Sequence, residues 1–219
     1  RMARGLHLAD EGNVVTLGVA ARHPQLTHVA TIDPHQPHGV QAEIARCLRA
    51  GIRLFRLFPT AHHWRLDSQP FHTILDHLRG TNAVLLLAVE EWGSASTIAR
   101  LTADYELPIV LLDVHYTQLA ECDAVMQRWP HVNAGTSRLA TPLDVETLVR
   151  NVGADRLLFG SEAPERPLQC ALNRIWYSDV SDTERAAIFG GNAARLLNEH
   201  GAPSSAGVAA PDAAPPSRS

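Results

Sequence analysis

The chain has 219 residues, 45% of them hydrophobic and 19% charged, which supplies a sizeable core for one domain or at most two. Its formal net charge of −4 and pI near 6.3 argue against a nucleic-acid binder with a broad basic face. No apolar run reaches the roughly 18 residues of a membrane span, so no membrane partner is expected.

Arginine supplies all 19 basic residues, because the sequence contains no lysine. Schiff-base aldolases, pyridoxal phosphate enzymes and ordinary P-loop proteins depend on a lysine and are therefore excluded. The 12 histidines keep metal-assisted and imidazole acid–base chemistry open. The three cysteines lie far apart and form no CxxC pair, which excludes a disulfide framework and predicts a cytoplasmic protein.

Short apolar runs alternate with longer amphipathic stretches along the chain. The runs are nearly continuous in hydrophobicity, as is typical of strands that are buried on both faces. They predict strands over 27–33, 52–59, 83–90, 108–115, 131–136 and 156–161. The amphipathic stretches between them predict helices over 40–50, 71–79, 94–105, 118–129 and 143–152.

The region after the last predicted strand should be helical. Ser181 and Glu184 form a capping-box pattern that predicts a helix over 182–189. Gly190 and Gly191 should break that helix, which resumes over 192–198. Residues 201–219 are rich in alanine, proline, serine and glycine without apolar periodicity, and they predict a disordered tail after a domain of residues 1–200.

Repeated strand–helix units predict the α/β class, with a parallel sheet and right-handed crossovers. About six such units are visible. An open sheet could hold them, and so could part of an eight-stranded barrel, which usually needs roughly 250 residues.

Two segments near the end of the domain resemble a known family. Residues 153–164 read Gly-Ala-Asp-Arg-Leu-Leu-Phe-Gly-Ser-Glu-Ala-Pro, and residues 190–197 read Gly-Gly-Asn-Ala-Ala-Arg-Leu-Leu. They resemble the last strand and closing helix of amidohydrolase-related, metal-dependent hydrolases. Residues 23–34, 51–59 and 108–115 are more weakly similar to earlier parts of the same family, so the resemblance runs from about its third strand onward.

The resemblance implies a TIM barrel, here incomplete because the first two strands are missing. It also implies hydrolase, decarboxylase or hydratase activity at a metal that is usually held by a His-x-His pair on the first strand and an aspartate on the last. This sequence contains no His-x-His pair, and Glu162 stands at the aspartate position. If a divalent metal such as zinc is bound, His115 and Glu162 are its expected ligands.

Catalytic residues of barrels lie at the carboxyl ends of strands, which makes Glu162 the first candidate. It would ligate a metal or move a proton; the alternative is an ion pair or a helix cap. Asp113 and His115 end another strand two residues apart, so alternation predicts that both face the same way and that Asp113 orients the imidazole. His115 could also be a purely structural histidine.

Four further residues are candidates for substrate binding. Arg56 lies within an apolar strand, where it would either clamp a substrate carboxylate or form an internal ion pair with Glu90, Asp113 or Glu162. Glu90 ends the third predicted strand. His62 and His63 follow the second strand and would form part of a pocket rim, unless they are ordinary surface histidines.

These observations leave three hypotheses. The first is an amidohydrolase-like enzyme that hydrolyses or decarboxylates a small carboxylated or amide-bearing metabolite. The second is a metal-free barrel that acts as a binding or regulatory protein. The third is a fragment of an ordinary metalloenzyme whose upstream sequence carries the His-x-His pair. The sheet edge left by the missing strands would be open, which predicts self-association into a homo-oligomer.

Overall fold

The structure is a computed structural model that describes residues 9–36 and 39–200. The predicted tail over 201–219 lies outside these residues. Within them, no helix combines the length and the apolar character needed to cross a membrane.

The described residues contain one sheet of six parallel strands, which are neighbours in the same order as in the sequence. All six lie inside the predicted runs, although each is shorter than predicted. The strands are β1 (Ala30–Thr31), β2 (Leu54–Leu57), β3 (Val84–Ala88), β4 (Ile109–Leu112), β5 (Val132–Gly135) and β6 (Leu157–Leu158). This sequential order is that of a barrel rather than of a doubly wound sheet, in which the strand order reverses.

Helices connect consecutive strands, which confirms the predicted α/β architecture. Those between the strands are α3 (Val40–Arg49), α4 (Gln69–Leu78), α5 (Ser94–Thr102), α6 (Leu119–Arg128) and α7 (Asp144–Val152). Those outside the repeat are α2 (Ala9–Arg22), α8 (Leu168–Trp176), α9 (Asp182–Ala186) and α10 (Asn192–His200). Two short 3₁₀ turns, η1 (Tyr116–Gln118) and η2 (Ala154–Arg156), lie beside β4 and β6. Neither α2 nor α8 was located from the sequence.

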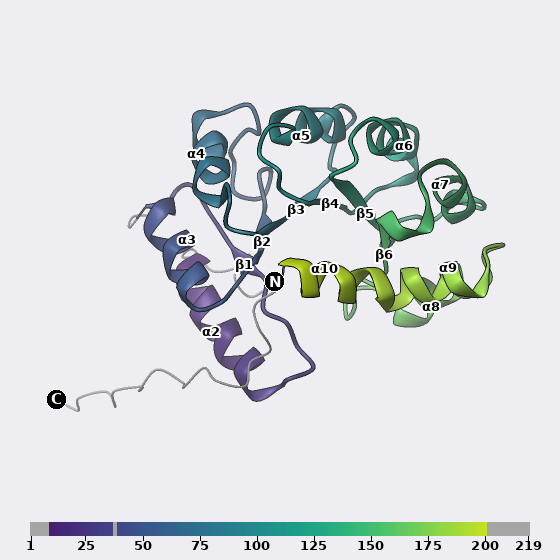
Figure 1. The fold of residues 1–219 in the computed structure, drawn as a ribbon, viewed down its shortest axis with the longest axis horizontal. Coiled ribbons are helices and arrows are strands. Elements are labelled where there is room, and N and C mark those ends of the chain that lie inside the picture. The colour runs from purple at the N-terminus through teal and green to yellow at the C-terminus, as the bar shows by residue number, and fades with distance from the viewer. Residues whose placement is uncertain (1–8, 37–38, 201–219) are drawn as a thin grey trace.

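The sheet is curved, and its two faces have different coverings (Figure 1). Helices α4 to α7 follow one another along the outer face, where alternate strand residues such as Phe55, Leu85 and Leu111 join the main core. The remaining strand residues form a second, smaller cluster around Val84 and Val110, and Leu196 of α10 packs against it. Helix α10 therefore crosses the inner face of the sheet.

The predicted break at Gly190 and Gly191 is wrong. The capping box of Ser181 and Glu184 starts α9 as expected, but residues Ala187–Gly191 form a π-helical turn, η3, that joins α9 to α10. A π turn widens the helix without ending it, so two glycines are accommodated where a stop was expected.

Asparagine side chains cover both edges of the sheet. Asn13 of α2 donates from Nδ2 to the Thr31 carbonyl (2.8 Å) and accepts from the Thr31 N–H through Oδ1 (2.8 Å). Asn192 of α10 donates to the carbonyls of Ala154 (2.7 Å) and Leu157 (2.8 Å) on the other edge. The amides take the place of a neighbouring strand's peptide groups, so the edge that was expected to be open is covered at β1 and at β6.

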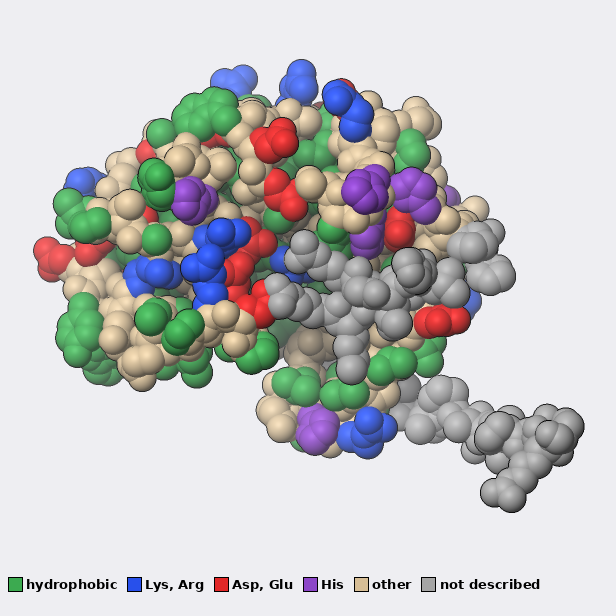
Figure 2. Space-filling model, turned by 180° about the vertical axis from the view of Figure 1, so that it is seen from behind, with side chains coloured by type: hydrophobic (Ala, Val, Ile, Leu, Met, Phe, Trp, Pro, Cys, Tyr) green, Lys and Arg blue, Asp and Glu red, His purple; other side chains and the backbone are tan. Residues whose placement is uncertain are grey.

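Charge on the surface is mixed rather than of one sign. Figure 2 shows acidic and basic side chains side by side near the middle of one face, next to apolar side chains. This mixture fits the small net charge of the sequence and offers no extended basic surface on that face.

Candidate functional site

The site begins where β6 ends. Four residues after the strand, Glu162 adopts a left-handed backbone conformation with φ 53°, which is uncommon for a residue other than glycine. Its carbonyl accepts hydrogen bonds from the N–H groups of Glu165 (2.9 Å) and Arg166 (3.2 Å), which folds the chain into a tight turn. One carboxylate oxygen lies 2.5 Å from Nε of Arg166, and the Glu162 side chain is only 22% exposed.

Asp113 follows β4 directly and also has a left-handed conformation, with φ 58°. Its Oδ2 accepts a hydrogen bond of 3.3 Å from Arg56 of β2, and the Ser137 hydroxyl lies 3.5 Å from Oδ1. Of the two roles open for Arg56, the structure shows the internal ion pair. The Arg56 guanidinium also lies over the Phe58 ring, 4.7 Å from its centroid.

The carboxyl groups of Glu162 and Asp113 meet at the rim of the sheet. Burial raises the pKa of Glu162 above its ordinary value, and so do a hydrogen bond with the Asp113 carboxyl and the charge of Asp113. The nearby charges of Arg166 and Arg138 act in the opposite direction with smaller effect. The close Arg166 pair does not reverse the shift, because that side chain is half exposed and water screens it. The site therefore holds a carboxyl pair that favours one shared proton.

The loop after β5 holds the pair from one side. Arg174 of α8 donates to the carbonyls of Thr136 (3.1 Å) and Ser137 (3.3 Å), which fixes the backbone that carries the Ser137 hydroxyl towards Asp113. Gly160 is required behind this loop, because a Cβ there would lie 3.1 Å from the Cβ of Ser137.

A third carboxylate, that of Asp33, extends the same rim towards β1. Asp33 lies 3.0 Å from Nδ1 of His35 and 3.5 Å from Nδ1 of His62, one through each carboxylate oxygen. His62 is 8% exposed and packs against the Phe58 ring. The Arg56 guanidinium lies over the same ring. Polar groups thus run along the carboxyl edge from β1 to β6. Asp33 was missed as a site residue, although it lies in a segment that resembles the family.

His115 does not join the carboxyl pair as the sequence predicted. Strand β4 ends at Leu112, and the positive φ of Asp113 turns the chain, so the alternation of a strand no longer applies to the next residues. The described contacts of His115 are a hydrogen bond of 3.1 Å with Thr117 and ring packing on Tyr116 at 4.2 Å.

Two of the other candidates are exposed. Glu90 follows β3 but points into solvent, and His63 is an exposed residue with φ 56° next to the buried His62. The structure thus brings together Glu162, Asp113 and Arg56.

The expected metal does not fit the side chains at this rim. Within residues 9–36 and 39–200, no group of three or more His, Cys, Asp or Glu side chains is arranged to hold a metal ion. Zinc sites use three or four such ligands, whereas here two carboxyl groups are accompanied by arginines and His115 turns towards Thr117. The chemistry proposed below therefore uses only side chains of the chain itself.

Two cavities among the described residues lie elsewhere, one of about 350 Å³ beside Glu43 and Arg46 between α2 and α3, and one of about 490 Å³ beside Trp176 on α8. Neither is lined by Asp113 or Glu162.

Together the fold and the rim define a TIM-barrel-like α/β protein with a cluster of carboxyl groups and arginines at the carboxyl edge of its sheet. Residues 9–198 match the family model described as amidohydrolase, and the chain belongs to this family. The resemblance seen in the sequence is thereby confirmed. None of the curated proteins matches the chain at a significant level.

Solved structures support the fold. An uncharacterised TIM-barrel protein from Bordetella bronchiseptica is 20% identical with a TM-score of 0.77, and the match covers 86% of this chain and 72% of that one. A 2,6-dihydroxybenzoate decarboxylase from Rhizobium is 15% identical with a TM-score of 0.71, and the match covers 90% of this chain and 81% of that one. A dihydroxybenzoic acid decarboxylase from Polaromonas with bound manganese is 16% identical with a TM-score of 0.69, covering 87% and 75%.

Proposed function

We propose that the protein is an enzyme that decarboxylates a small carboxylated metabolite, with Glu162 as the proton donor. The observation that carries this proposal is the burial of Glu162 beside the Asp113 carboxyl group, because burial first and Asp113 second raise the pKa of Glu162 and favour its acid form. Decarboxylation needs a proton for the carbon that loses CO₂, and cations help to bind the substrate carboxylate beforehand; this rim offers an acid and arginines. Hydrolysis of an amide-bearing metabolite is the other reaction open to a member of this family.

In the proposed reaction, Glu162 donates its proton to the substrate carbon that bears the carboxylate, and a π electron pair of the unsaturated substrate forms the new C–H bond. The bond from that carbon to the carboxylate then breaks, its electron pair restores the π system, and CO₂ leaves. Glu162 remains as a carboxylate and regains a proton from solvent. Arg56 and the Ser137 hydroxyl contact the Asp113 carboxyl group, and the raised pKa of Glu162 favours the proton on Glu162.

Similarity to aromatic acid decarboxylases supports this reaction, because two of the structures with this fold carry that activity in their names. Their substrates suggest the first compounds to test here, namely hydroxylated benzoates. At 15–16% identity the likeness concerns the fold, so the proton donor and substrate are proposals for this chain.

The first experiment measures CO₂ release from a panel of hydroxybenzoates and the incorporation of deuterium from D₂O at the vacated carbon. Glu162→Gln should lower kcat at least about 100-fold, because the amide has no proton to give. Glu106→Gln is the matched control: Glu106 is exposed, has the same φ of 53°, and lies at the amino end of β4. A Glu162→Gln variant as active as the wild type would contradict the assignment.

The second candidate function is a binding or regulatory protein without catalysis. The ion pair between Arg56 and Asp113 favours it, because an arginine engaged internally is not available to clamp a substrate. If no acid in the panel yields CO₂ but a carboxylic acid raises the Tm of the protein, this second function is preferred.

A further inference from the structure

Around the Glu162–Asp113 pair, the rim contains three arginines and two carboxyl groups. Arg56 pairs with Asp113 at 3.3 Å, and Arg166 pairs with Glu162 at 2.5 Å. Arg138, which directly follows Ser137, is close enough for its charge to lower the pKa of Glu162. With one proton shared by the carboxyl pair, these five side chains carry a net charge of +2, so the rim attracts an anion.

The surroundings of Arg138 leave one hydrogen-bond donor of its guanidinium without an acceptor. Its Nε atom is buried and has no hydrogen-bond partner in the part of the chain that the structure describes. A buried donor without an acceptor costs stability, and natural proteins rarely keep one without a reason. A carboxylate would satisfy Nε and a neighbouring amino group together through the two-pronged geometry that arginine offers.

Apolar side chains lie on the inner face of the sheet below the rim. They are only partly buried although they pack beside the small core cluster, and they come from β2, β3, β4 and β6: Leu54, Leu86, Leu112 and Leu158. A ligand with a planar carboxylate on an apolar body matches this combination better than a phosphate, whose second charge would face Asp113 and Glu162.

We propose that Arg138 binds the carboxylate of the ligand, whereas Arg56 and Arg166 are engaged internally by Asp113 and Glu162. This inference depends on the proposed function only in placing the ligand at the same rim. It reassigns to Arg138 the binding role that the sequence suggested for Arg56. No sequence pattern marked Arg138, because it follows the end of β5 in an ordinary polar loop.

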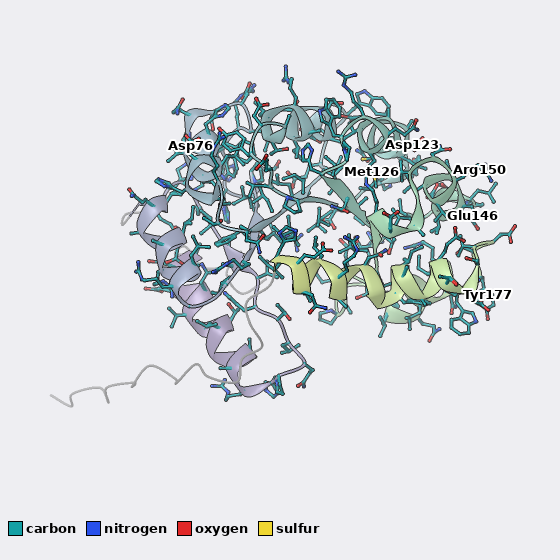
Figure 3. The ribbon with its side chains drawn as sticks, in the orientation of Figure 1. Asp76, Asp123, Met126, Glu146, Arg150 and Tyr177 are labelled. Carbon is teal, nitrogen blue, oxygen red and sulfur yellow. The ribbon has the colours of Figure 1, made fainter. Side chains whose placement is uncertain are left out.

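Binding of benzoate to the full chain, compared with its uncharged isostere benzamide, tests this role by calorimetric titration. The wild type should bind benzoate at least about tenfold more tightly than benzamide, and Arg138→Gln should lose at least about tenfold in benzoate affinity. Arg150→Gln provides the control, because Arg150 is an exposed arginine in the last turn of α7 and lies on its outer side (Figure 3). It should bind benzoate as the wild type does.

Two further variants make the result decisive. Arg138→Lys keeps the charge but loses the paired N–H donors of the guanidinium, so its benzoate affinity should fall between those of the wild type and Arg138→Gln. Arg56→Gln should lower the Tm of the ligand-free protein, whereas Arg138→Gln should leave it unchanged or raise it. If Arg138→Gln does not fold, Arg138→Lys decides, and benzoate affinity equal to that of the wild type then overturns the proposal.

The outcomes separate this inference from the proposed reaction. Benzoate binding that depends on Arg138, without release of CO₂ from any acid, would contradict only the proposed reaction. Release of CO₂ that depends on Glu162, with unchanged benzoate affinity and KM in Arg138→Gln, would contradict only the role of Arg138. A wild type that does not distinguish benzoate from benzamide also overturns it.

Discussion

Glu162 and Asp113 show how a single residue's backbone places a functional group. Both have positive φ values, 53° and 58°, and both come directly after or within a few residues of a strand end. Such conformations are costly for residues other than glycine and concentrate at functional sites. Here the two positive φ values turn carboxyl groups from different strands towards each other. The strain of the backbone is therefore accompanied by electrostatic repulsion between the two carboxyl groups.

This electrostatic cost predicts how stability depends on pH. Because its pKa is raised in the folded state, Glu162 holds its proton more tightly there than in the unfolded chain. Between its ordinary value of 4.5 and the raised value, unfolding releases that proton, so the contribution of Glu162 to stability falls as pH rises. Glu162→Gln should therefore gain stability relative to the wild type as pH rises through this window, by about 1.4 kcal/mol for each unit of elevation.

Urea denaturation of both proteins at a series of pH values measures this difference. Glu106→Gln serves again as the control, since Glu106 is an exposed carboxylate at the opposite end of β4 from Asp113. A Glu162→Gln difference that decreases as pH rises would mean that the pair with Arg166 dominates and that Glu162 is held ionised.

Two of the site residues could be predicted from the sequence for a simple physical reason. Glu162 and Asp113 end apolar runs, and the carboxyl ends of parallel strands meet at one edge. The position of His115 could not be predicted in the same way, because a single residue with positive φ ends the alternation. Arg138 and Asp33 escaped notice because a polar residue in a loop has no periodicity that would reveal its partners.

At the scale of elements, the strands were found because continuous apolar runs between helices leave few alternatives. Helix α2 was missed because its burial pattern is inverted. Val14 and Val15 are 56% and 47% exposed, whereas Asn13 is 1% exposed. An apolar stripe is the signal that identifies a helix, and α2 instead buries a polar residue to cover the edge of β1.

Asn13 should therefore be one of the most sensitive positions for stability. Asn13→Ala removes two hydrogen bonds to the Thr31 backbone and one of 2.7 Å to Glu43, and it leaves buried groups without partners. We expect a loss of about 3 kcal/mol in the free energy of unfolding, and about 2 kcal/mol for Asn192→Ala on the opposite edge.

Chemical denaturation checks both values, with Asn151→Ala as the matched control. Asn151 is exposed and donates to Asp123 on the surface, so its loss should cost about 0.5 kcal/mol or less. If Asn13→Ala were no more destabilising than Asn151→Ala, the edge of β1 would not depend on the amide.

At the scale of the whole molecule, the strand order and the curvature follow from the repeat of strand and helix. The way in which the two edge strands are covered does not follow from this repeat. The sequence suggested a bare edge, since strands with no partner expose a row of N–H and C=O groups. The structure instead covers β1 with Asn13 and β6 with Asn192, and the Phe159 N–H donates to the Ile188 carbonyl at 3.0 Å. Side chains that are distant in sequence provide this cover, and local patterns do not reveal such pairs.

Covered edges predict how association responds to mutation. In the double variant Asn13→Leu and Asn192→Leu, the backbone groups of Thr31 and Leu157 lose their amide partners, while a branched side chain still fills each position. Exposed strand edges pair readily with other chains, so the mass of this variant in light scattering should rise with concentration more steeply than that of the wild type. The single variant Asn192→Leu should show a smaller rise, since one edge stays covered.

Equal masses for the wild type and a folded double variant at every concentration would show that these amides do not control pairing. In that case, any self-association of the protein would have to use another surface, such as the exposed Trp176 and Tyr177.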